Sequence, residues 1–83
     1  MPTLTLYTRR GCALCEEFLA ELAPWGAARN LPVEVRDVDD NDITRRRYGL
    51  KVPVLEFDGL AVCYGRLDLA ELERLMRPRA SGR

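Results

Sequence analysis

The sequence predicts an α/β fold in which a four-stranded mixed sheet carries helices on both faces. Extended apolar segments alternate with helix-like segments in the order βαβαββα, and a two-residue turn, Asp58-Gly59, joins the last two strands. The chain has 83 residues, which suits one small domain spanning residues 1–83. A right-handed crossover makes the first two strands parallel and a hairpin makes its own strands antiparallel, so the sheet is expected to be mixed.

The first strand is expected at residues 3–7, and the first helix begins near Cys12. Four large apolar residues recur at helical spacing and predict one buried stripe: Leu14, Phe18, Leu22 and Trp25. Pro24 has no backbone N–H to donate, so the helix is expected to kink or end near Ala23. A kinked continuation to Arg29 is the alternative.

Residues 33–38 alternate apolar and polar side chains, which predicts the second strand. Residues 39–42 are all Asp or Asn, the residue types that cap helix starts. A short second helix is therefore expected over Asp42–Tyr48. Gly49 closes it, as glycine often does just past a helix end.

The third strand is expected at residues 53–57 and the fourth at residues 60–64. Asp68 stands at the cap position of the last helix, with acidic Glu71 three residues later. The buried face of this helix is predicted to hold Leu69, Leu72, Leu75 and Met76. Pro78 ends the helix, and residues 79–83 are expected to be a frayed tail.

Composition narrows the class of function. The formal net charge is zero, which favours neither a nucleic-acid nor an acidic-membrane partner. No apolar run is long enough for a transmembrane helix, and the N-terminus lacks the pattern of a signal peptide. We therefore expect a cytoplasmic monomer. Structural disulfides are uncommon in that compartment, and three cysteines is an odd number for a disulfide framework.

Cys12 and Cys15 form a C-A-L-C motif between the first strand and the first helix. A helix start carries unpaired N–H groups and partial positive charge, which favour the reactive thiolate. We expect Cys12 to be the more reactive thiol, with a pKa below the free value of about 8.5. The second thiol, three residues later, lies on the same helix face and can attack a mixed disulfide formed by the first.

Arg9 and Arg10 precede this pair and leave two interpretations open. Either they are exposed loop residues without a special role, or one of them stabilises the thiolate or contacts an anionic thiol substrate.

Three features together resemble the thioredoxin superfamily, and most closely the glutaredoxin-like group of very small bacterial proteins. They are the segment L-T-L-Y-T-R-R-G-C-A-L-C ending at Cys15, the segment Y-G-L-K-V-P-V-L around Pro53, and the Asp58-Gly59 hairpin before a final helix. The resemblance covers residues 3–77 and implies a thioredoxin-like fold.

The resemblance also implies roles for individual residues. Cys12 would be the attacking thiol and Cys15 the resolving thiol. The Val52–Pro53 peptide bond would be cis and lie beside Cys12, and the backbone of Val52 would pair with an incoming peptide or glutathione. Position in the sequence, and not the resemblance, makes two basic residues candidate substrate contacts: Arg10, which precedes Cys12, and Lys51, which lies close to the Pro53 edge and would contact a glutathione carboxylate.

Departures from the family pattern bear on the substrate. Glutaredoxins that use glutathione usually carry C-P-Y-C, T-V-P and G-G-x-D-D, where this chain has C-A-L-C, K-V-P and C-Y-G-R-L-D. The double glycine is missing, and only Gly65 and Asp68 stand near that position. The chain therefore matches the fold and the dithiol better than it matches glutathione specificity.

The leading interpretation is a small dithiol thiol–disulfide oxidoreductase that reduces protein or low-molecular-weight disulfides. It would hold no bound cofactor, would take glutathione as a candidate co-substrate, and would depend on a cellular reductant. The alternative is a non-catalytic module on the same fold. That module would use Cys12 and Cys15 for a metal or iron–sulfur cluster, or the Pro53 edge for a peptide. A mononuclear zinc site usually has four ligands, and this chain has no histidine and one further cysteine.

Cys63, in the expected fourth strand, has two interpretations. A free cysteine on a strand is often a small buried residue and nothing more. However, the fourth strand should end at the same sheet edge where the third begins with Pro53. Cys63 would then lie on the Cys12 side of the sheet and could be a third redox position.

Overall fold

The computed structural model describes residues 2–76. In chain order its elements are β1 (Leu4–Thr8), α1 (Ala13–Ala27), β2 (Val33–Asp37), the 3₁₀ turn η1 (Val38–Asp40), α2 (Asp42–Tyr48), β3 (Val54–Phe57), β4 (Leu60–Tyr64) and α3 (Leu69–Met76). The predicted order βαβαββα is therefore confirmed. The predictions made for Pro78 and for residues 79–83 lie outside the described residues.

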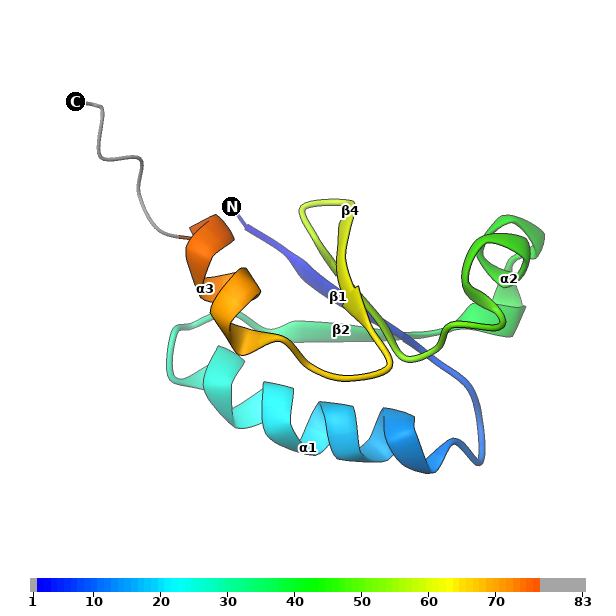
Figure 1. Cartoon of the computed structure of the whole chain (residues 1–83), viewed down its shortest axis with the longest axis horizontal. Helices are drawn as coiled ribbons and strands as arrows, with labels where there is room; N and C mark the ends of the chain where they lie inside the picture. Colours follow the sequence, from blue (N-terminus) through cyan, green and yellow to red (C-terminus); the bar gives the residue numbers. More distant parts are fainter. Residues whose placement is uncertain (1, 77–83) are drawn as a thin grey trace.

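The four strands form one mixed sheet in the order β2-β1-β3-β4 (Figure 1). β1 pairs with β2 in parallel and with β3 in antiparallel orientation, and β3 pairs with β4 in antiparallel orientation. The hairpin between β3 and β4 turns at Asp58 and Gly59, which have φ angles of 52° and 84°. Two consecutive positive φ angles define the tight turn that the Asp-Gly pair predicted.

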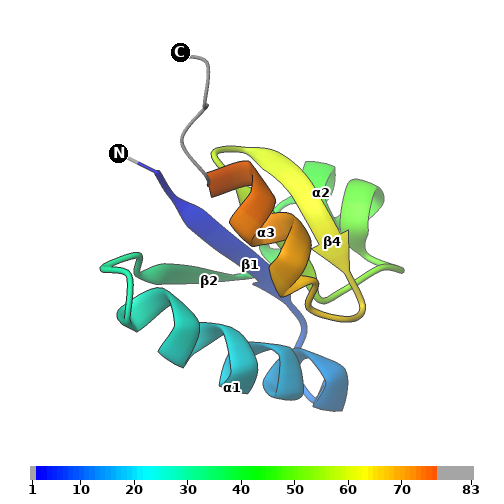
Figure 2. The same ribbon diagram turned by 60° about the vertical axis from the view of Figure 1, so that its left-hand side comes forward.

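Helices pack on both faces of the sheet, as predicted (Figure 2). The larger core lies between the sheet and the helices α1 and α3, and its buried members are Leu4, Leu6, Phe18, Leu22, Leu31, Leu55 and Leu72. A smaller cluster lies on the other face, under α2, and consists of Val38, Tyr48 and Val54. Full burial of such side chains contributes about 1.5–3 kcal/mol each, so the face of α1 and α3 supplies most of the stabilisation.

The buried stripe of α1 differs from the prediction. Phe18 and Leu22 are buried, but the other buried positions are Cys15 and Gly26. Leu14 is 53% exposed, and Trp25 is only partly buried. The pattern of large apolar residues does not predict this face, because two of its buried positions hold the small residues Cys15 and Gly26.

The first helix does not end near Ala23 but runs through Pro24 to Ala27. Beyond the proline, Gly26 packs so closely that an added Cβ would lie 2.5 Å from the carbonyl oxygen of Leu31. The Leu31 N–H also donates to the Gly26 carbonyl, at 2.8 Å. These contacts hold the last turn of α1 against the chain that leads into β2.

Side-chain caps define the starts of the other helices. Asn41 accepts from the N–H groups of Ile43 and Thr44, at 2.7 and 3.3 Å, and begins α2. Asp68 accepts from the Glu71 N–H at 3.0 Å and begins α3, as predicted. The stripe predicted for α3 is wrong at Leu75, which is 42% exposed. Only Leu72 is fully buried in this helix, and Leu69 and Met76 are partly buried beside it.

Candidate active site

Cys12 is the N-cap of α1, and its backbone is still extended, with φ −95° and ψ 104°. The Cys15 N–H donates to the Cys12 sulfur at 3.1 Å. A cap residue normally uses a side-chain oxygen for this bond, so here the sulfur takes the oxygen's place. The helix start therefore directs a hydrogen-bond donor and its partial positive charge at the Cys12 sulfur, which stabilises a thiolate there.

The two cysteines are joined as a disulfide, with their Cα atoms 5.2 Å apart. This separation lies within the range in which cysteines bridge without backbone movement. The two sulfurs differ in access, because Cys15 is only 4% exposed whereas Cys12 is partly exposed. Cys12 is therefore the more accessible sulfur of the pair.

A second segment ends at the same edge of the sheet. Tyr7 of β1 pairs with Val54 of β3, and Val54 also pairs with Tyr64 of β4. The loop that leads to Cys12 leaves this edge, and the loop that carries the cis Val52–Pro53 bond enters it. The strand register therefore brings these two loops and the chain that leaves β4 to one end of the sheet. The sequence predicted this arrangement for β3 and β4.

The Val52–Pro53 loop presents free backbone groups. The Pro53 carbonyl accepts from the Gly65 N–H at 2.8 Å, which ties this loop to the chain after β4. Val52 belongs to no helix or strand. Within residues 2–76, neither its N–H nor its C=O takes part in a backbone hydrogen bond of the loops and turns. Its backbone is therefore available to pair with an extended chain.

The basic residues near the pair have different surroundings. Arg9 donates to Asp39 through Nε at 2.9 Å and Nη2 at 3.0 Å, and to the Gly49 carbonyl through Nη1 at 2.7 Å. Neither interpretation of the sequence described this arrangement. Arg10 is exposed, and the Lys51 Nζ lies 5.5 Å from the centroid of the Tyr64 ring. The substrate contacts assigned to Arg10 and Lys51 stay predictions.

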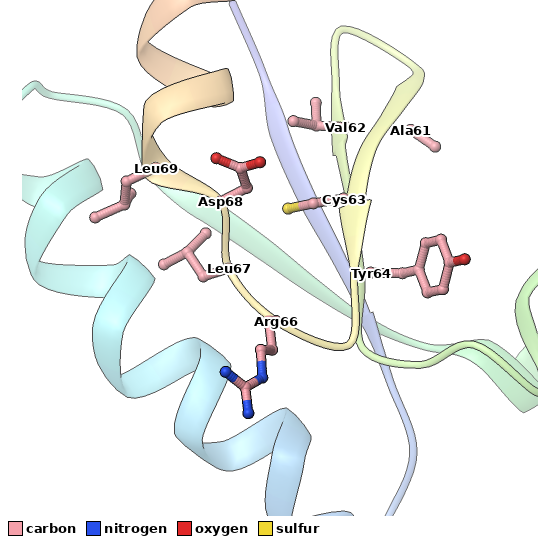
Figure 3. Close-up of a pocket in the computed structure, with 8 residues that line it drawn as sticks. All are labelled: Ala61, Val62, Cys63, Tyr64, Arg66, Leu67, Asp68 and Leu69. Carbon is pink, nitrogen blue, oxygen red and sulfur yellow. The ribbon is translucent and has the colours of Figure 1, made fainter.

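Two hollows flank these elements. One, of about 340 Å³, lies between α1 and residues 65–67, and the exposed Leu14 is part of its wall. The other, of about 600 Å³, follows β4 and the residues before α3, and its lining includes Cys63 but neither Cys12 nor Cys15 (Figure 3). The smaller hollow is lined by neither cysteine, but Leu14 in its wall stands between Cys12 and Cys15 in the sequence.

Cys63 lies one residue before the end of β4 and pairs with Leu55, two residues after Pro53. Figure 3 shows its sulfur turned toward the segment of Leu67 and Asp68, where it packs against the larger core. Burial raises the pKa of the Cys63 thiol above its usual value, and the backbone of Asp68 offsets part of this effect. Its redox role stays a prediction.

A metal site was one of the alternatives. Among residues 2–76, no three His, Cys, Asp or Glu side chains are grouped so that they could hold a metal ion.

Within the same residues, no helix is long and apolar enough to cross a bilayer.

The chain matches the model of the family described as Glutaredoxin-like domain (DUF836) over residues 3–77. It belongs to this family. The matched residues cover every described helix and strand. The resemblance expected from the C-A-L-C and K-V-P segments is therefore confirmed.

Two solved structures are similar to this member of the glutaredoxin-like family. The solution NMR structure of protein Ne2328 from Nitrosomonas europaea is 32% identical, with a TM-score of 0.80 and a match covering 89% of each chain. The X-ray structure of protein XcR50 from X. campestris is also 32% identical, with a TM-score of 0.62 and coverage of 89% of this chain and 95% of that one. Both support the thioredoxin-like fold.

Sequence patterns do not indicate Asp39 or Gly49 as parts of the site, whereas Gly65 stands near the position of the family's double glycine. Asp39 was interpreted only as one of several capping residues, and Gly49 only as a helix end. The sequence predicts that Gly49 ends α2, as a glycine in a left-handed turn often does. Its φ of −57° is ordinary, however, so the position does not need a glycine for its backbone conformation. An added Cβ there would collide with the Arg45 carbonyl and lie 3.3 Å from Nη2 of Arg9.

Proposed function

We propose that this protein is a dithiol thiol–disulfide oxidoreductase that reduces protein or low-molecular-weight disulfides through Cys12 and Cys15. The single observation that carries the proposal is the hydrogen bond from the Cys15 N–H to the Cys12 sulfur, at 3.1 Å, at the head of α1. Membership of the glutaredoxin-like family and the burial of Cys15 support the same assignment.

The reaction proceeds in two exchanges that balance in atoms and electrons. The Cys12 thiolate attacks one sulfur of the substrate disulfide, forms a mixed disulfide and releases the other sulfur as a thiolate, which takes a proton from solvent. Cys15, after losing its proton, attacks the Cys12 sulfur and releases the second substrate thiol. The substrate gains two electrons, and the protein is left with the Cys12–Cys15 disulfide, which a cellular thiol or dithiol then reduces.

The substrate edge in this proposal is the backbone of Val52, next to Pro53. An extended segment that flanks the substrate cysteine would accept from the Val52 N–H and donate to its C=O, as a strand added to a sheet edge does. Arg10 and Lys51, both exposed, are the candidate contacts for acidic groups, including the carboxylates of glutathione. Glutathione is proposed as a co-substrate and not as a bound cofactor.

The proposal is tested by reduction of the interchain disulfides of insulin, with dithiothreitol as the reductant. We expect the wild type to accelerate the reaction, Cys15→Ser to lose most of the acceleration, and Cys63→Ser to keep it. Cys63→Ser is the matched control because it removes a thiol outside the pair. If Cys15→Ser keeps full activity in a second assay in which glutathione replaces dithiothreitol, the protein works through one thiol and the dithiol mechanism is wrong.

A non-catalytic role for the same fold is separated by the same preparations. A module that holds a metal or an iron–sulfur cluster between two copies would carry the ion in stoichiometric amount, and Cys12→Ser would lose it. We expect no stoichiometric metal in the wild type and measurable disulfide reduction. Metal content without reduction would favour the module instead.

A further inference from the structure

We propose that Arg9 is a positioning residue, which holds the loop of Cys12 and the loop of Val52 in one fixed arrangement through Asp39 and Gly49. The inference rests on the proposed function, because it explains how the two halves of that site stay together. We call the hydrogen bonds of Arg9 to Asp39 and to Gly49 the Arg9 bridge.

The bridge joins segments that lie far apart in the sequence. Arg9 begins the loop from β1 to Cys12, whereas Asp39 lies 30 residues away in η1 and Gly49 lies 40 residues away, just after α2. Gly49 stands three residues before Val52. One guanidinium therefore ties the loop that carries the nucleophile to the loop that carries the substrate edge.

The geometry of the bridge suits an arginine. Nε and Nη2 bind both oxygens of Asp39, at 2.9 and 3.0 Å, while Nη1 reaches the Gly49 carbonyl at 2.7 Å. The planar fork of a guanidinium makes such paired contacts, and a lysine ammonium is a point charge that does not reproduce them. The Gly49 carbonyl also lies at the C-terminal end of α2, where a cation is favoured.

Gly49 makes room for this approach. Its Cα is buried, and an added Cβ would lie 3.3 Å from Nη2 of Arg9 and would collide with the Arg45 carbonyl. The glycine thus allows the guanidinium to reach the end of α2.

The bridge fixes geometry more than it adds stability. The side chains of Arg9 and Asp39 are 37% and 41% exposed, and ion pairs with such exposure contribute little to folding. A direct action of the Arg9 charge on the Cys12 thiolate is a different role. It is disfavoured because the charge of Arg9 is already opposed by Asp39, and the two readings make opposite predictions for substitutions.

The experiment compares the full-length wild type with Arg9→Gln, Arg9→Lys and Asp39→Asn. Arg36→Gln is the matched control, because Arg36 also donates two hydrogen bonds to one carboxylate, Glu34, but within a single strand. Two quantities are measured: kcat and KM for insulin reduction, and amide hydrogen exchange over residues 10–15 and 49–53.

If Arg9 positions the two loops, all three bridge variants lose kcat/KM, on the order of tenfold, with KM rising more than kcat falls. They also exchange faster over both segments, and Arg36→Gln changes neither quantity beyond about twofold. Asp39→Asn is decisive, because it keeps the Arg9 charge and removes an opposing one. A charge acting on the thiolate would leave Arg9→Lys near the wild type and raise the reactivity of Asp39→Asn.

The proposal is overturned if Arg9→Lys and Asp39→Asn both behave as the wild type. It is also overturned if faster exchange is confined to residues 49–53, since Arg9 would then only cap α2. The amide exchange does not depend on catalysis. If the wild type reduces no disulfide, the proposed function fails while the exchange data still decide whether the bridge joins the two loops.

Discussion

Cys12 stands at the head of α1 with a backbone N–H directed at its sulfur, whereas Cys63 stands near the end of β4 with its sulfur turned toward Leu67 and Asp68. Both are cysteines near the same edge of one sheet. The helix start stabilises a thiolate at Cys12, and burial raises the pKa of the Cys63 thiol. The local hydrogen-bond donor, more than the position in the fold, therefore favours Cys12 over Cys63 as the nucleophile.

The largest effect that the comparison predicts concerns activity. Cys12→Ser should lower kcat/KM for disulfide reduction on the order of a thousandfold or more, because no other group replaces the nucleophile. Cys63→Ser should stay within about twofold of the wild type. Steady-state kinetics on insulin measures both. An equal loss in the two variants would break the comparison, because Cys63 would then share the chemistry.

The next effect concerns thiol reactivity in the reduced protein. At pH 7, iodoacetamide should modify Cys12 at least about tenfold faster than Cys63, because the thiolate fraction is larger at Cys12. Peptide mapping at a series of pH values gives the rate at each thiol. The assignment of Cys12 as the nucleophile would be contradicted if Cys12 reacted more slowly than Cys63. It would also be contradicted if the modification rate of Cys63 began to rise at a lower pH than the rate of Cys12.

The surroundings of the two thiols should also respond differently to acid. The hydrogen bond from Arg9 lowers the pKa of Asp39 below its ordinary value of 3.8. A carboxylate with a depressed pKa stabilises the folded protein above its ordinary pKa, and this contribution is lost as the pH falls through the depressed value. Asp39→Asn should therefore lower Tm at neutral pH. The difference from the wild type should shrink as the pH falls below 3.8 and vanish below the depressed pKa of Asp39.

Thermal unfolding over a pH series tests this dependence. Cys63→Ser is the control. Burial raises the pKa of the Cys63 thiol, so this thiol stays uncharged in the acid range and its substitution should show no such acid-dependent difference. A Tm difference for Asp39→Asn that persists unchanged at low pH would show that the ion pair is not its source.

The smallest effect concerns packing. Cys63 is partly buried against the larger core, so Cys63→Ala should destabilise the protein by about 1 kcal/mol. Denaturant unfolding measures it, with an unchanged m-value expected because the exposed area on unfolding is the same. A loss of unfolding free energy well above this value would mean that Cys63 is packed as tightly as the core residue Leu55. The two cysteines would then differ even more in their surroundings.

Much of the fold could be predicted from local signals in the sequence. The alternating pattern placed β2, the Asp-Gly pair placed the hairpin turn, and Asp68 placed the start of α3, because each feature acts over a few residues. The position of Cys12 at the head of α1 was predictable for the same reason.

The remainder depends on contacts between distant segments. Leu14 was expected in the core, but the buried face of α1 is completed by Cys15 and Gly26, whose small size gives no apolar signal. The hydrogen bonds of Arg9 cross 30 and 40 residues, and no local spacing indicates that Asp39 and Gly49 meet one side chain. Tertiary geometry decides such pairs, and periodicity does not report it.

The central claim is that Cys12 attacks the substrate and Cys15 resolves the mixed disulfide. It is tested most directly by trapping. The reduced Cys15→Ser variant is mixed with a peptide disulfide, quenched with acid, digested and mapped by mass spectrometry. We predict one peptide bound through a mixed disulfide at Cys12 and none at Cys63. A peptide bound at Cys63, or no mixed disulfide at Cys12, would contradict the account.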